Sequence, residues 1–253
     1  MIISKKKIYL KVSDINKGYD LEATSSKTFL KDLKRFFSSE KKYRKQIEVL
    51  SDCNMVLEEG ESLALIGVNG SGKSTFLKIL SKISTPDSGS VLVNESIASL
   101  LSLTSGLEAE FTGHENIYFL GSALGMTKQE ISNQYEKIIQ FSELGKFINT
   151  PLKRYSAGMK IRLAFSIASN LSSKIILLDE ILVLIDRDFK EKCIQKLREL
   201  VDIEKKSIIF VSHEREFNKK FCNSGIVLNK GIMSQKMSIN DAYNYYDSIN
   251  KSF

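Results

Sequence analysis

The stretch LALIGVNGSGKSTFLKIL (63–80) decides the fold, because it runs from an apolar strand through a glycine-rich loop into a helix. Residues 67–74 within it match the pattern G-x-x-x-x-G-K-[ST]. In this pattern the glycines let backbone N–H groups turn inward around phosphates, and the helix that follows adds the positive end of its dipole. The stretch therefore predicts a phosphate-binding loop between a buried strand and a helix.

Side chains of this loop have separate predicted tasks. Lys73 supplies a positive charge at the β- and γ-phosphates of a nucleotide, and the Ser74 hydroxyl can bind Mg²⁺. The strand–loop–helix context disfavours the alternative of an ordinary glycine-rich turn. ATP and Mg²⁺ are the expected cofactors, although the loop alone would also accept GTP. We expect the nucleotide to contact the rest of the loop as well: Gly67, Asn69, Gly70, Ser71, Gly72 and Thr75.

A second apolar stretch, IILLDE (175–180), ends in two acidic residues. A buried strand that delivers Asp179 to its carboxyl end provides the Mg²⁺ ligand that this kind of site requires. Glu180 follows, where a carboxylate could orient the attacking water and remove its proton. Acidic residues also cap strands for structural reasons alone, and the phosphate loop is what favours the catalytic interpretation here.

His213 is one of two histidines and follows the apolar strand IIFV (208–211) and Ser212. Loops at strand ends of an α/β sheet collect active-site residues. At such a position the imidazole could hydrogen-bond the γ-phosphate and respond to its loss. A lone histidine is more often an ordinary surface or core residue, but the order of the motifs favours the catalytic prediction.

The stretch YSAGMK (155–160) opens a helix with apolar residues at helical spacing. Ser156 is a good N-cap residue, so a capped helix is the simplest interpretation. That interpretation does not explain why Ala157 and Gly158, two further small residues, stand beside it. A helix N-terminus without bulky side chains offers its backbone donors to a phosphate, which is the functional alternative.

Short apolar strands alternate with longer helical patterns along the chain, which is typical of an α/β protein with a largely parallel sheet. We predict strands at 8–12, 47–50, 63–66, 91–93, 97–101, 175–178, 208–210 and 225–228. Helical patterns cover 114–125, 127–141, a stretch from about 156, and 240–250. The predicted organisation is one domain over 1–253, with a basic helical insert at 24–46, a helical subdomain at 110–170 and a C-terminal helix at 237–253.

The net charge of +7 is concentrated in the insert at 24–46, where eight Lys or Arg and two acids give a local charge of +6. One interpretation is a solvated charged helix. Another is a helix near anionic headgroups or a membrane partner, since clustered Lys and Arg at a membrane contribute about 1 kcal/mol each. Nucleic-acid binding is disfavoured, because no readout motif accompanies the charge.

Bulk composition is that of an ordinary soluble domain, with 42% hydrophobic and 26% charged residues. No apolar run approaches the roughly 18 residues that a membrane-spanning helix needs. The start MIISKKKIYLKVS lacks the apolar core and cleavage site of a secretory signal. Cys53, Cys193 and Cys222 follow no metal-ligand spacing, so we expect free thiols in a reducing cytosol.

Together these motifs resemble those of the ABC transporter nucleotide-binding domain over essentially the whole chain. The resemblance implies a P-loop NTPase fold, ATP hydrolysis and a head-to-tail homodimer. In that dimer the signature helix of one subunit contacts the γ-phosphate held by the other. The signature would consist here of Tyr155, Ser156, Ala157 and Gly158, with Tyr155 and Ala157 in place of the family's usual Leu and Gly.

The same resemblance suggests two further site residues. Asp186 lies seven residues after Asp179, where the family's inter-subunit aspartate loop falls. Tyr19, in the stretch NKGY before the basic insert, resembles the aromatic residue that stacks on adenine.

A closer resemblance is to the ATPase subunits of bacterial polysaccharide exporters, which move O-antigen, capsular polysaccharide or teichoic acid. It is carried by the YSAGM signature, the insert, and the runs EFTGHENIYFLGSALGMTKQEI (110–131) and ELGKFINTPLKRYSAGM (143–159). Ile181 follows the Asp-Glu pair, where ABC importers usually have Pro. ABC domains normally also have a Gln that senses the permease, but residues 85–128 contain none, and Ser102 or Glu108 could take its place.

The resemblance implies a peripheral ATPase on the cytoplasmic face of a bacterial plasma membrane, partnered by a second copy and a separate permease that exports a polysaccharide. Because the sequence ends after a short helix, we do not expect the C-terminal sugar-binding domain of longer relatives. One alternative is an exporter ATPase for a lipid, peptide or drug. Others are a soluble ABC protein acting on ribosomes or DNA, and a nucleotide-gated structural subunit with negligible turnover.

Overall fold

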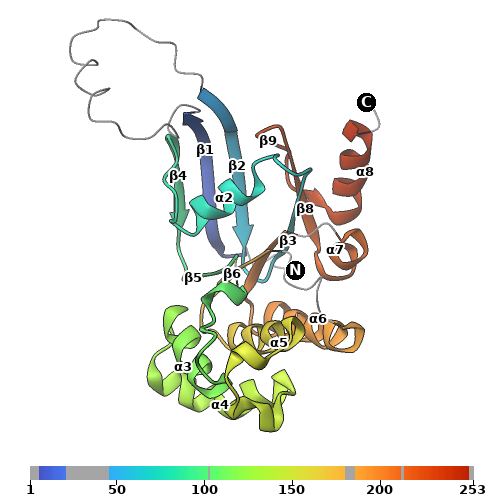
Figure 1. The fold of residues 1–253 in the computed structure, drawn as a ribbon. Helices are drawn as coiled ribbons and strands as arrows, with labels where there is room; N and C mark the ends of the chain where they lie inside the picture. The colour runs from blue at the N-terminus through green and yellow to red at the C-terminus, as the bar shows by residue number, and fades with distance from the viewer. Residues whose placement is uncertain (1–5, 21–45, 102, 180–185, 212–213, 251–253) are drawn as a thin grey trace, which may run out of the picture.

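The structure is a computed structural model that describes residues 6–20, 46–101, 103–179, 186–211 and 214–250 (Figure 1). Its strands are β1 (Ile8–Asp20), β2 (Gln46–Glu58), β3 (Ser62–Ile66), β4 (Ser88–Val93), β5 (Ile97–Leu100), β6 (Ile175–Asp179), β7 (Ser207–Val211), β8 (Ser224–Asn229), β9 (Ile232–Met233) and β10 (Met237–Ser238). Its α-helices are α2 (Lys73–Leu80), α3 (Gly113–Ala123), α4 (Lys128–Ser142), α5 (Ala157–Ala168), α6 (Arg187–Asp202), α7 (Arg215–Phe221) and α8 (Ile239–Asn250).

The sheet has a parallel half and an antiparallel half. In the parallel half the strand order is β8-β3-β7-β6-β5, and in the other half β1 pairs antiparallel with both β2 and β4. β9 joins the halves, because it pairs parallel with β2 and antiparallel with β8. The α/β fold class predicted from the alternating pattern is confirmed. Ligands bind beyond the carboxyl ends of the strands in such sheets, and β3 lies within the parallel half, between β8 and β7.

Alternating side chains of the central strands divide the core into two. Leu63 and Leu65 of β3 belong to one buried cluster with Phe76 of α2, whereas Ala64 and Ile66 belong to the other. The second cluster also holds the apolar faces of α5 and α6. β3 is therefore buried on both faces, as its continuous apolar sequence predicts, and its end is held firmly in place.

Helices α3, α4 and α5 form a helical layer at the end of the molecule opposite the β1–β2–β4 arm (Figure 1). α3 and α4 each begin with a capping box, in which a threonine side chain and the glutamate three residues later bond reciprocally to the backbone. The two capping pairs are Thr112 with Glu115 and Thr127 with Glu130. These helices lie where the sequence pattern predicts them.

The first two strands are much longer than predicted, 8–20 and 46–58 instead of 8–12 and 47–50. Asp14 (φ 52°) and Asp52 (φ 46°) have left-handed backbone conformations, and the pairing register shifts nearby. These bulges let polar residues typical of turns continue the strands. The helix predicted for the basic insert lies outside the described residues, apart from Gln46 in β2.

At the other end of the chain, Met237 and Ser238 form β10, so the predicted C-terminal helix begins at Ile239. In the part of the chain that the structure describes, no helix combines the length and the apolar character that a membrane span requires.

Candidate nucleotide-binding site

The loop between β3 and α2 needs glycine at two positions, one because of its backbone conformation and one because there is no room for a Cβ. Gly72 precedes the first residue of α2 with φ 109°, and a Cβ there would lie 2.8 Å from the Val49 carbonyl oxygen. At Gly67 a Cβ would lie 2.3 Å from the Leu228 carbonyl oxygen. The loop therefore needs glycine at both positions, and it packs against β2 and β8 while its backbone leads into the N-terminus of α2.

Lys73 is held at the head of this loop with only 8% of its surface exposed. Its Nζ donates hydrogen bonds to the backbone carbonyls of Gly67 (2.7 Å) and Val68 (3.0 Å). A buried ammonium group is costly unless anions or oxygens surround it, so this position suits a phosphate. Ser71 Oγ is also buried and has no hydrogen-bond partner among the described residues, which leaves a polar group available beside the loop.

The phosphate loop and the end of β6 open onto one cavity of about 290 Å³. Its lining combines the backbone of the loop with the polar side chains predicted for the metal, and it consists of Val49, Asn69, Gly70, Gly72, Lys73, Ser74, Thr75, Asp179 and Val211. The Ser74 hydroxyl and the Asp179 carboxylate are oxygen donors of the kind that Mg²⁺ prefers, so both fit the ion. The remaining coordination positions suit phosphate oxygens and water.

Two predicted catalytic residues, Glu180 and His213, lie outside the described residues. Each follows a strand end that the structure places at the cavity, because Asp179 and Val211 pair with each other in β6 and β7 and both line it. Sequence reasoning missed Val49 and Val211 as lining residues. Val211 could have been found from its place at the end of the apolar strand IIFV, two residues before the candidate His213. Val49 belongs to a predicted strand that packs against the loop in the structure.

Tyr19 stands at the far end of β1, opposite Ile47 of β2. Its side chain is 45% exposed, and Lys17 Nζ lies 5.4 Å from the ring centroid. The tyrosine does not line the cavity, although Val49, two residues beyond Ile47, does. An exposed ring on the β1–β2 pair, which borders the cavity through Val49, could stack on an adenine. The role of Tyr19 in adenine binding stays a prediction.

The predicted signature residues form the start of α5, away from the cavity. The Ser156 side chain caps the helix by accepting a hydrogen bond from the Met159 backbone N–H (3.2 Å). Ser156 and Ala157 are exposed and Gly158 is half-buried, so the helix end is open. Tyr155 differs from these three, because it is buried and its hydroxyl donates to the Phe147 carbonyl (2.7 Å). Burial raises the pKa of Tyr155 to about 12.

Asp186 caps the N-terminus of α6 and does not line the cavity. One carboxylate oxygen accepts a hydrogen bond from the Phe189 backbone N–H (3.0 Å), and the other accepts one from Arg162 Nη2 (2.5 Å). The Arg162 guanidinium holds the pKa of the Asp186 carboxyl below its usual value. In the single chain this carboxylate is therefore engaged with its own α5 and α6.

The sequence profile of the family described as ABC transporter matches residues 50–183, which include the phosphate loop, α5 and β6. This chain belongs to the ABC transporter family. It is 40% identical over 176 residues to the O-antigen export system ATP-binding protein RfbB of Klebsiella pneumoniae, a match that covers 69% of this chain and 70% of that protein. It is 34% identical over 248 residues to the teichoic acids export ATP-binding protein TagH of Listeria monocytogenes, covering 98% and 72%.

Other curated relatives are longer. The matched part of this chain spans only 37% to 60% of the length of three of them. Among solved structures, the chain is similar to an ATP-binding subunit of an ABC transporter, with a TM-score of 0.75 and 22% identity over 94% of this chain and 93% of that one. It is also similar to a dimeric ATP-binding cassette bound to ADP and Pi, with a TM-score of 0.72 and 22% identity over 91% and 98%. These similarities establish the fold.

Proposed function

We propose that this chain is the ATP-hydrolysing subunit of a bacterial ABC exporter whose separate permease carries a polysaccharide of the O-antigen or teichoic acid class. The observation that carries the proposal is the single cavity onto which the phosphate loop, Ser74 and Asp179 open together. The similarity to ATP-binding proteins of O-antigen and teichoic acid export supports the class of cargo.

The residues of the cavity divide the work of phosphoryl transfer to water. Lys73 and the N–H groups of the loop hold the β- and γ-phosphates, and Ser74 and Asp179 hold Mg²⁺. When bound, Mg²⁺ neutralises charge on the phosphate oxygens. Glu180 follows Asp179 directly, and we assign to it the orientation and deprotonation of the attacking water. His213 is assigned to the γ-phosphate, because it follows the strand that carries Val211 to the cavity.

A second copy of the chain would complete each site. The open N-terminus of α5, with Ser156, Ala157 and Gly158, can donate backbone hydrogen bonds to a phosphate but lies away from the cavity of its own chain. In a head-to-tail homodimer it would face the phosphate loop of the partner. ATP binding would then close the dimer, and hydrolysis would open it.

The opening and closing of the dimer would be passed to the permease at the cytoplasmic face of the plasma membrane. The basic insert at 24–46 is suited to that surface, because its charge of +6 would be attracted to anionic headgroups. We place the chain there as a peripheral subunit and assign recognition of the polymer mainly to the permease.

The experiment that tests hydrolysis is the substitution Glu180→Gln, measured as Mg-ATPase activity and as ATP-dependent dimer formation by light scattering. Loss of the base should lower kcat by about 10²- to 10⁴-fold while ATP binding is retained, so ATP should trap a dimer. Lys205→Gln, at an exposed lysine that does not line the cavity, serves as the matched control. An active Glu180→Gln protein would refute the assignment of the base.

The cargo class is tested by deleting the gene in the bacterium that carries it and analysing surface glycans. Loss of one surface polysaccharide, restored by the wild-type gene but not by Glu180→Gln, is the expected result. Unchanged glycans together with loss of an exported lipid or peptide would instead support an exporter with another cargo.

A further inference from the structure

The end of β1 is fastened to the turn before β4 through a single residue, Asp87. Its Oδ2 accepts a hydrogen bond from the Gly18 backbone N–H (2.7 Å), and its Oδ1 accepts one from Lys17 Nζ (2.6 Å). The Asp87 backbone N–H donates in turn to the Asn16 carbonyl (2.9 Å). Asp87 therefore binds three consecutive residues of β1 and directly precedes β4.

This attachment lies at an irregular point of the sheet. The pairing register of β1 against β2 shifts between Lys17 and Gly18. Such a bulge disrupts the ladder locally and re-aims the side chains around it. At Gly18 a Cβ would lie 3.3 Å from the Ile47 carbonyl oxygen, so the two strands approach closely here. The Asp87 carboxylate thus satisfies a backbone N–H at the bulge and fixes the strand directly before Tyr19.

Lys17 connects the Asp87 carboxylate to the Tyr19 ring. The Lys17 side chain is only 13% exposed, and its ammonium group lies over the Tyr19 ring, 5.4 Å from the ring centroid. A cation at this distance over an aromatic face is attracted by the ring electrons. The pKa of Asp87 is lowered, first by the hydrogen bond from Lys17 and then by the one from the Gly18 N–H. The carboxylate therefore holds Lys17, and Lys17 holds the ring.

Contacts among described residues lead from this end of β1 to the phosphate loop. Tyr19 pairs with Ile47 of β2, and two residues further along β2 Val49 lines the nucleotide cavity. The Val49 carbonyl oxygen lies only 2.8 Å from where a Cβ of Gly72 in the loop would stand. β2 thus bridges the Tyr19 end of β1 and the loop that is predicted to hold the phosphates.

We propose that Asp87 is a positioning residue for nucleotide binding, which holds Lys17 and Gly18 and thereby fixes the Tyr19 ring where it can stack on adenine. This inference rests on the proposed function and deepens it at the base of the nucleotide. Asp87 does not line the nucleotide cavity, so it acts through Tyr19. It contributes to the affinity for the base and leaves the affinity for the phosphates unchanged.

The decisive experiment measures the affinity of the purified full-length chain for MgATP and, separately, for inorganic tripolyphosphate with Mg²⁺, by isothermal titration. Asp87→Ala should weaken MgATP binding by about two- to tenfold, the range that aromatic stacking provides. Tripolyphosphate binding should be unchanged, because it has no base and the loop is untouched. Asp87→Asn should show a smaller loss, since its amide oxygen can still accept from the Gly18 N–H but offers Lys17 no charge.

A double variant tests whether Asp87 acts through the ring. Substitutions that affect one shared contact are not additive. Asp87→Ala should therefore cause little further loss of MgATP affinity in a chain that already carries Tyr19→Ala. Additive losses would overturn the inference. So would an Asp87→Ala protein that binds MgATP like wild type, or one that loses affinity for tripolyphosphate to the same degree.

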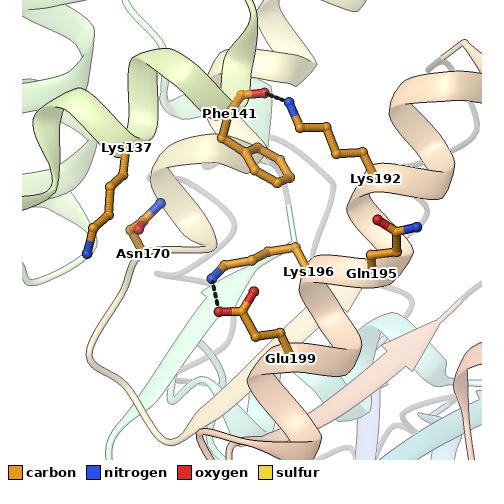
Figure 2. A pocket seen from close by; sticks show the side chains of 7 residues that line it. All are labelled: Lys137, Phe141, Asn170, Lys192, Gln195, Lys196 and Glu199. Carbon is orange, nitrogen blue, oxygen red and sulfur yellow. Dashed lines mark hydrogen bonds and ion pairs between the residues drawn. The ribbon is translucent and has the colours of Figure 1, made fainter.

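A matched control for Lys17 is available in another cleft, of about 260 Å³, between α4 and α6 (Figure 2). Lys196 lines it and resembles Lys17, because its side chain is 18% exposed and pairs with the Glu199 carboxylate (3.0 Å). Lys17→Met should weaken MgATP binding, whereas Lys196→Met should bind like wild type. Equal weakening by the two variants would overturn the inference.

The melting temperature separates folding from binding. The Asp87 side chain is 53% exposed, so its loss should change the melting temperature little. If Asp87→Ala does not fold, Asp87→Asn and Lys17→Met decide, and wild-type MgATP affinity in both would overturn the inference while the proposed function stands. A wild-type chain that binds neither MgATP nor tripolyphosphate would refute the proposed function and the inference with it.

Discussion

The phosphate loop and the start of α5 are both glycine-containing helix N-termini, yet the chain presents them in opposite ways. The loop forms part of a cavity with Lys73 buried at its head and Asp179 at the end of β6 in the same sheet. The start of α5 stands open, with Ser156 and Ala157 exposed and no share in that cavity. Both ends have backbone donors for an anion. Among the described residues, the first also has a cavity wall, a buried cation and a carboxylate that we predict to bind Mg²⁺, and the start of α5 does not share that cavity.

This difference shows that a helix N-terminus becomes a complete site only through what the surrounding fold adds to it. At the phosphate loop the parallel strands β3, β6 and β7 bring the necessary side chains together. At the start of α5 the described contacts of Tyr155 are structural: its side chain is buried, and its hydroxyl donates a hydrogen bond to the Phe147 carbonyl (2.7 Å). The proposed second copy would supply the missing wall.

The largest expected effect comes from Gly158→Asp, which places a carboxylate in the first turn of α5. A Cβ at Gly158 would meet only Ser156 Oγ, at 3.9 Å, and an acid in a first helical turn is favourable, so the chain should fold normally. Facing a phosphate of the partner, the same charge should abolish ATP-dependent dimerisation and lower ATPase activity by about 10²-fold or more. Light scattering and phosphate release measure the two effects.

The control for that variant is Gly158→Asn, which has nearly the same volume without the charge. It should retain far more activity than Gly158→Asp, and both should bind ATP at the loop like wild type. Lys73→Ala should show the reverse pattern, with binding itself lost. A fully active Gly158→Asp protein would mean that α5 does not meet a phosphate, and the contrast between the two helix ends would lose its functional meaning.

The two regions also differ in how far they could be predicted. The phosphate loop is a local pattern in which strand, turn and helix signals agree, so its place between β3 and α2 followed from the sequence. Asp179 lines the same cavity, and its role as a Mg²⁺ ligand stays a prediction. The capped start of α5 could likewise be predicted from neighbouring residues alone. The hydrogen bond from Arg162 to Asp186 could not. That contact joins α5 to α6 across the intervening β6, and no spacing rule connects the two residues.

The β1–β2 arm shows why strand lengths were underestimated. Its polar residues interrupt the apolar pattern that was used to predict the strands, but they bond to each other across the pair. The Asp14 backbone N–H donates to the Asn54 side chain (3.1 Å), and the Asp52 backbone N–H donates to the Asn16 side chain (3.0 Å). Each amide thus satisfies the backbone at the opposite bulge. The stabilising partner lies on the other strand, so a local reading of either strand could not reveal it.

A smaller effect is expected at Tyr19, the residue predicted to stack on adenine outside the cavity lining. Tyr19→Ala should weaken ATP binding by about two- to tenfold, the range that aromatic stacking provides. Isothermal titration would measure it, with Tyr19→Phe expected to bind like wild type and Tyr245→Ala as an exposed tyrosine elsewhere. Unchanged affinity in Tyr19→Ala would show that Tyr19 does not contact the adenine. The described cavity would then account for binding of the phosphates but not of the base.

The smallest effect should come from Tyr155→Phe, which separates packing from function within the predicted signature. Loss of the hydrogen bond to Phe147 should cost about 0.5–1.5 kcal/mol of unfolding free energy and leave ATPase activity unchanged. The pKa of Tyr155 is raised to about 12, so its neutral form stabilises the fold, and this contribution is lost as pH rises from about 10 through 12. Urea titrations should therefore show a shallower alkaline loss of stability in the variant than in wild type. An activity loss as large as that of Gly158→Asp would instead place Tyr155 at the phosphate, against its burial in the single chain.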